Sequence, residues 1–163
     1  MAAAGAPTMR IGVFRTPITP ALGIRLQGSI TRAEPAWRVM DDLYAQVLLL
    51  QSGDERFALV TCDLIEFEPS FVEGLRAQVQ SRFGIRPANL MLCASHTHTG
   101  PPTIALGSLL PDREYLAVLG SKILGGIFAA GRALQEVRVS AGRGRAEGVG
   151  INRRRPTPKG IRQ

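Results

Sequence analysis

The sequence LYAQVLLLQSGDERFALVTCDLI, at residues 43–65, contains two apolar runs on either side of a short polar stretch. The runs Leu43–Gln51 and Phe57–Ile65 are joined by Ser52-Gly53-Asp54-Glu55, and a glycine-containing connection of this length is typical of a β-hairpin. Both runs are almost continuously apolar, which is the pattern of strands covered on both faces. We therefore expect an antiparallel pair of strands at the centre of a sheet.

The flanking sequence predicts strands and helices in mixed order. Further strands are expected at Arg10–Thr16, at Leu90–Ala94 and, as a strand or ribbon, at Val137–Val149. One helix is expected to begin at Pro69 and to end before Gly84, and a second to begin after Asp112. This order favours an α/β fold in which flanking helices pack on a mixed sheet.

The composition is that of one globular domain with a basic balance. The chain has 163 residues, of which 45% are hydrophobic and 20% are charged, and its formal net charge is +7. Nearly all the positive charge is arginine, since Lys122 and Lys159 are the only lysines. Aromatic residues are few and do not interleave with the basic positions, which argues against nucleic-acid binding. A basic module that holds an anionic surface through Arg143, Arg145 and Arg153–Arg155 remains an alternative.

The cysteines and the apolar segments bear on the cellular compartment. Cys62 and Cys93 lie in predicted strands and are expected to be small buried hydrophobic residues outside any disulfide framework. Met1–Thr8 lacks the features of a secretory signal, and the apolar stretch around Ile123–Ala130 is too short to span a bilayer. The sequence as it stands therefore predicts a cytoplasmic protein without a transmembrane segment.

The two histidines of the chain, His96 and His98, follow the predicted strand Leu90–Ala94 directly. Strand side chains alternate with period two, so a His-x-His pair at a strand end is expected to present both imidazoles on one face. Neutral imidazole is the commonest protein ligand of zinc and related metals. The pair predicts a metal site, although solvated histidines in a polar loop are the alternative.

Other polar residues are expected at the same edge of the sheet, where open sheets gather their ligands. Asp63 and Glu66 follow the Phe57 strand, and Arg153 follows the last predicted ribbon. Together with the imidazoles they would suit a hydrolytic metal site, although carboxylates at a helix start are often only solvated. Catalytic zinc needs three protein ligands, so two histidines alone leave the donor set incomplete.

The segment around the histidines resembles a known family motif. Ser95-His96-Thr97-His98-Thr99-Gly100-Pro101 is similar to the Thr-His-Thr-His-x-Gly-Pro signature of the neutral/alkaline non-lysosomal ceramidases. Four shorter segments resemble elements of that family in the same order. They are Ile18-Thr19-Pro20 followed by Gly28 and Arg32, Asp42-Leu43-Tyr44-Ala45, Thr61-Cys62-Asp63-Leu64, and Ile151-Asn152-Arg153.

This resemblance implies a zinc-dependent hydrolase of lipid metabolism that cleaves the N-acyl amide bond of ceramide, a sphingolipid, or of a related lipid amide. It implies that His96 is a zinc ligand and that His98 is a catalytic and substrate-binding residue that lines the same site. It also implies that Arg153 is a catalytic and substrate-binding residue, which stabilises negative charge developing on the substrate carbonyl.

Members of this family have a longer catalytic domain that completes the zinc site, and full-length relatives can be exported. The resemblance therefore implies that residues 1–163 are the N-terminal part of such a domain, inactive alone, with residues 1–9 and 156–163 flexible. The expected partners are the lipid amide and the missing C-terminal half. A relic fragment is a further alternative.

Overall fold

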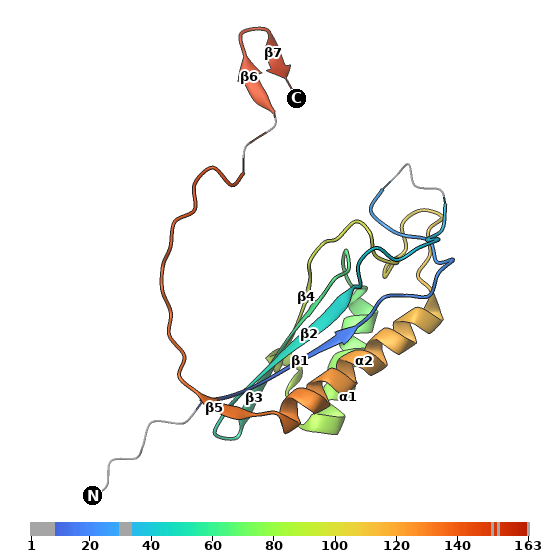
Figure 1. Cartoon of the computed structure of the whole chain (residues 1–163). Helices are drawn as coiled ribbons and strands as arrows, with labels where there is room; N and C mark the ends of the chain where they lie inside the picture. The colour runs from blue at the N-terminus through green and yellow to red at the C-terminus, as the bar shows by residue number, and fades with distance from the viewer. Residues whose placement is uncertain (1–8, 30–33, 151, 153, 163) are drawn as a thin grey trace, which may run out of the picture.

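Five strands form one mixed sheet in the order β4-β3-β2-β1-β5 (Figure 1). This computed structural model describes every residue except 1–8, 30–33, 151, 153 and 163. All neighbouring strands of the sheet are antiparallel except β3 and β4, which are parallel. The strands are β1 (Met9–Pro17), β2 (Tyr44–Ser52), β3 (Glu55–Cys62), β4 (Leu90–Ala94) and β5 (Gln135–Val137).

The hairpin predicted from residues 43–65 is confirmed. β2 and β3 pair from Ala45 with Cys62 to Ser52 with Glu55, so the connection is two residues long rather than four. Gly53 occupies the turn with φ 57°, a left-handed conformation that glycine adopts without steric cost. β2 lies between β1 and β3, at the centre of the sheet, as the sequence predicts.

Two helices begin and end near the predicted residues. α1 (Pro69–Phe83) has proline in its first turn and is closed by Gly84, whose backbone N–H donates to the Gln80 carbonyl at 3.0 Å. α2 (Arg113–Arg132) begins at Asp112, whose side chain accepts a hydrogen bond from Tyr115 N at 2.9 Å. α1 and the 3-10 turn η1 (Pro87–Asn89) form the crossover between the parallel strands β3 and β4.

Both helices cover the same face of the sheet, and the core lies between them and the strands. Every second residue is buried against this layer from Ala45 to Leu49 in β2 and from Ala58 to Cys62 in β3. The central members of the core are Val47, Leu49 and Val60 from the sheet, Leu75 and Val79 from α1, and Leu119, Ile123 and Ile127 from α2.

The opposite face of the sheet carries apolar side chains without a helix layer above them. Val13, Leu48, Leu59 and Met91 are consecutive neighbours across β1, β2, β3 and β4. Val13 is 64% exposed and Met91 is 52% exposed. The prediction that β2 and β3 are covered on both faces is therefore wrong for the described part of the chain. Their outward residues are apolar enough for a covered strand, but both helices lie on the other face.

The predicted ribbon over Val137–Val149 is also wrong. Only Gln135–Val137 pair with β1, and residues 138–150 leave the sheet as an extended segment (Figure 1). This segment holds Gly142, Gly144, Gly148 and Gly150 among exposed arginines, so it has little apolar surface to bury. Within the terminus that the sequence predicts to be flexible, β6 (Arg155–Thr157) and β7 (Gly160–Arg162) pair as a hairpin. Residues 1–8 of the predicted flexible N-terminus lie outside the described residues.

α2 is long and apolar enough to cross a membrane when judged by length and composition alone. The core helix of a soluble protein passes the same test, and in this structure one side of α2 packs on β1 and β2. The absence of a transmembrane segment stays a prediction.

Tyr115 ties α2 to the segment after β1, because its buried hydroxyl donates to the Ile18 carbonyl at 2.9 Å. Burial is also the main cause that raises the pKa of Tyr115, so the hydroxyl keeps its proton. Tyr115→Phe should lower the free energy of unfolding in urea by about 1–3 kcal/mol, since the Ile18 carbonyl loses its donor. Tyr44→Phe is the control, because phenylalanine keeps the ring face that Arg15 covers at 3.3 Å. Equal effects of the two substitutions would contradict this role.

Candidate metal site at the end of β4

The segment after β4 is held against the segment after β3 by backbone hydrogen bonds. Ser95 N donates to the Cys62 carbonyl at 3.0 Å, and His96 N donates to the Leu64 carbonyl at 2.9 Å. Because β3 and β4 are parallel, the chain leaves both strands at the same end of the sheet. The residues following these two strands are thereby brought together, as expected for a ligand site at strand ends.

The two imidazoles lie side by side at this end of the sheet. The ring centroids of His96 and His98 are 5.1 Å apart, with the ring planes inclined by 60°, and both residues are exposed. The predicted juxtaposition is confirmed, but its physical reason differs from the one expected. β4 ends at Ala94, and His96 has φ 61°, a left-handed conformation that is uncommon for residues other than glycine. A turn of the loop, rather than strand alternation, therefore brings the rings together.

One nitrogen of His96 already has a protein partner. Its Nδ1 lies 2.9 Å from the Ile65 carbonyl oxygen, which accepts a hydrogen bond when Nδ1 carries the proton. In that tautomer Nε2 has the lone pair that can bind a metal ion. Metal-binding histidines commonly donate their other ring nitrogen to a carbonyl or carboxylate in this way.

A separate segment, Gln27–Gly28, packs against the histidine loop. Gln27 N donates to the Gly100 carbonyl at 2.9 Å. A Cβ at Gly28, which has φ +108°, would lie 2.5 Å from the Cα and Cβ of His98. The fully buried side chain of Gln27 donates through Nε2 to Glu66 Oε1 at 3.3 Å. Sequence reasoning found Gly28 only through the family resemblance and missed Gln27, for which no local pattern gives a signal.

The carboxylates predicted to join the histidines have other partners. Asp63 Oδ2 accepts a hydrogen bond from Tyr44 N at 3.0 Å, which ties the start of β2 to the end of β3. Glu66 accepts from Gln27 through its side chain, and its backbone carbonyl accepts from Thr103 Oγ1 at 2.5 Å. Arg153 lies outside the described residues, so its catalytic role stays a prediction.

The residues present supply part of a zinc site. Two neighbouring imidazoles suit zinc, and the His96–Ile65 contact favours the ligating tautomer. Across the described ranges, however, no group of three or more histidine, cysteine, aspartate or glutamate side chains could hold a metal ion. The imidazole pair therefore fits zinc only if further donors come from other residues.

Cys62 does not add a thiolate to this site. Burial, and after it the negative charges of Asp63 and Cys93, raise the pKa of the Cys62 thiol to about 12. The thiol is therefore protonated at neutral pH, and Cys62 packs in the core as the sequence predicts.

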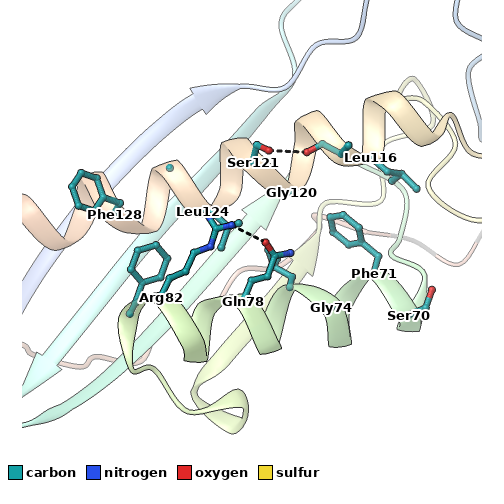
Figure 2. Close-up of a pocket in the computed structure, with 14 residues that line it drawn as sticks. Ser70, Phe71, Gly74, Gln78, Arg82, Leu116, Gly120, Ser121, Leu124 and Phe128 are labelled. Atoms are coloured by element: carbon teal, nitrogen blue, oxygen red, sulfur yellow. Dashed lines mark hydrogen bonds between the residues drawn. The ribbon is translucent and has the colours of Figure 1, made fainter.

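A cavity of about 730 Å³ lies away from the histidines, between α1 and α2 (Figure 2). Its walls include Gly74 and Gly120, which have no side chain to fill the space, and the rings of Phe71 and Phe128. None of His96, His98 and Asp63 lines this cavity, so it does not belong to the candidate metal site.

The solved structures that share this fold include two ceramidases. One is neutral ceramidase from Pseudomonas aeruginosa, with a TM-score of 0.71 and 20% identity over 80% of this chain. The other is a ceramidase complexed with C2, with a TM-score of 0.69 and 21% identity over 80% of this chain. No family model and no curated protein matches the sequence.

The predicted fold class is confirmed by this likeness and by the five-stranded mixed sheet. The chain spans 22% of the length of each of these two proteins, so its architecture corresponds to a fragment of a larger domain.

Proposed function

We propose that this chain is part of a zinc-dependent amide hydrolase of the neutral ceramidase type, which cleaves ceramide or a related lipid amide. The observation that supports the proposal is the imidazole pair of His96 and His98, held at the end of β4. The pair belongs to a fold that is shared with ceramidase structures. The resemblance of residues 95–101 to the family motif supports a catalytic role for the same pair.

Each residue has a separate task in this proposal. His96 donates a hydrogen bond from Nδ1 to the Ile65 carbonyl and presents Nε2 as a metal ligand. His98, packed against Gly28, lies beside the substrate and orients its amide. Arg153 stabilises the negative charge that develops on the substrate carbonyl oxygen. A zinc ion held there would polarise the substrate carbonyl and make a water molecule beside it more acidic.

We expect residues 1–163 alone to bind zinc weakly and to show no turnover of a fluorogenic ceramide. Two imidazoles are fewer donors than a catalytic zinc site uses. Calorimetry at neutral pH should give weak binding that is lost in His96→Ala and kept in Thr97→Ala, the loop control. Tight binding that survives His96→Ala would contradict the ligand assignment. Zinc-dependent turnover lost in His96→Ala would show that the chain holds a complete site and would overturn the proposed incompleteness.

A second candidate, a basic binding module, is favoured by the position of the charge. Residues 1–137 contain twelve basic and twelve acidic side chains, so the net charge of +7 lies entirely in residues 138–163. Arg145 pairs with Glu147 at 2.7 Å, and Arg143 is exposed in the extended segment. Binding to anionic vesicles that requires Arg143 and Arg145, without any zinc binding, would favour this module over the hydrolase.

A further inference from the structure

The cavity between α1 and α2 is a groove that both helices line along their length (Figure 2). Its lining residues run from Ser70 to Arg82 on α1 and from Leu116 to Phe128 on α2. Twelve residues of helix rise about 18 Å, and the volume of about 730 Å³ is in the usual range of small-molecule sites. The groove shares no residue with the candidate metal site.

The groove has aromatic walls and an open middle. Phe71, Phe83 and Phe128, three of the six phenylalanines of the chain, line it. The ring of Phe128 is left uncovered, since this residue is 56% exposed. A Cβ at Gly74 or Gly125 would meet nothing within 4 Å, so the space beside the rings is empty of protein atoms. Uncovered rings beside open space suit a ligand with an aromatic body.

Arg82 gives the groove its charge. It is the one charged residue among the lining side chains that the structure describes. Figure 2 shows its guanidinium between the two helices, where Nη2 donates to Gln78 Oε1 at 3.3 Å. None of the ion pairs in the described ranges involves Arg82. A guanidinium with only a neutral partner keeps donors for an anion, and the planar carboxylate matches its geometry.

We propose that this groove binds an aromatic monocarboxylate. The ring system would lie over Gly74 and Gly125 against Phe128, and the carboxylate would accept hydrogen bonds from Arg82. This binding site goes beyond the proposed hydrolase and uses none of its residues. It is tested by binding alone, so either proposal can fail without the other.

The test uses 2-naphthoate, titrated into residues 1–163 in a calorimeter. We expect saturable binding, together with nuclear Overhauser contacts between the naphthoate protons and the Phe128 ring. 2-Naphthamide has the same ring system without the negative charge. It should bind about tenfold more weakly, which corresponds to about 1.4 kcal/mol.

The charge requirement is tested with Arg82→Gln, which should weaken naphthoate binding about tenfold and leave naphthamide binding unchanged. The matched control is Arg132→Gln. Arg82 and Arg132 are the basic residues in the last turns of α1 and α2, and of these two only Arg82 lines the groove. Both substitutions remove one positive charge from a helix end, so an effect of net charge or of the helix dipole would appear in both.

The space requirement is tested with Gly74→Leu, which should abolish naphthoate binding because the new side chain fills the groove. Leucine favours the helix over glycine, and its Cβ has open space at this position, so α1 should remain folded. The control is Ala77→Leu, at an exposed position of the same helix outside the groove. Circular dichroism checks that each variant folds.

Losses in Arg82→Gln and Gly74→Leu, with binding kept in the two controls, would support the proposal. Equal binding of naphthoate and naphthamide, or equal losses in the two arginine variants, would overturn it, since the groove would then lack charge selection. No heat and no contact with Phe128 would also overturn it. A dimer in sedimentation that Gly74→Leu abolishes and Ala77→Leu keeps would overturn it too, because a second copy would then occupy the groove.

Discussion

Gly12→Ala is expected to lower the free energy of unfolding by about 3 kcal/mol or more, a large fraction of the stability of an ordinary domain. A Cβ at position 12 would lie 1.9 Å from the Ala130 carbonyl oxygen and 2.7 Å from its carbon. Both atoms are backbone, so no side chain can rotate away, and α2 would have to move off β1. Urea denaturation followed by circular dichroism measures the loss.

The control is Gly125→Ala in α2, the helix whose backbone Gly12 approaches. A Cβ there meets nothing within 4 Å, and alanine favours the helical conformation over glycine by about 1 kcal/mol. Gly125→Ala should therefore keep or raise the free energy of unfolding. If Gly12→Ala were as stable as the unmodified chain, the close contact between β1 and α2 would be wrong.

Gly28→Ala is expected to separate the two imidazoles and to abolish the weak zinc binding of the chain. The added Cβ would lie 2.5 Å from the Cα and Cβ of His98 and 2.6 Å from its Cγ. Relief of that clash requires either the loop after β4 or the Gln27–Gly28 segment to move. Zinc calorimetry and the nuclear Overhauser contacts between the His96 and His98 rings measure the change.

Gly23→Ala separates this clash from backbone strain. Gly23 also has a positive φ, +90°, but a Cβ there meets nothing within 4 Å. Both substitutions strain the backbone by about 1–2 kcal/mol, and only Gly28→Ala should displace His98. Equal zinc binding in the two variants would show that Gly28 does not position the imidazole.

The sequence predicts the elements whose causes are local. The β2–β3 turn follows from Gly53, the end of α1 from Gly84, and the start of α2 from Asp112. Each is set by the φ preference or side-chain hydrogen bond of one residue, so neighbouring residues suffice to find it.

Features made by distant segments are harder to predict. The Gln27–Gly28 segment meets the histidine loop some seventy residues later in the chain, and no periodicity records that contact. The outward apolar residues of β2 and β3 indicate that the strand surface avoids water, but not what covers it. The adjacency of His96 and His98 follows from a left-handed residue that strand alternation does not predict.

β4, the strand that carries the histidine loop, is at the edge of the sheet. One side of its backbone pairs with β3, and the other side presents N–H and C=O groups to any additional strand. A polypeptide that paired there in parallel would leave the sheet beside His96 and His98 and could contribute donors to the same ion. The edge where unwanted aggregation is most easily seeded is thus also the edge from which a longer chain can complete the site.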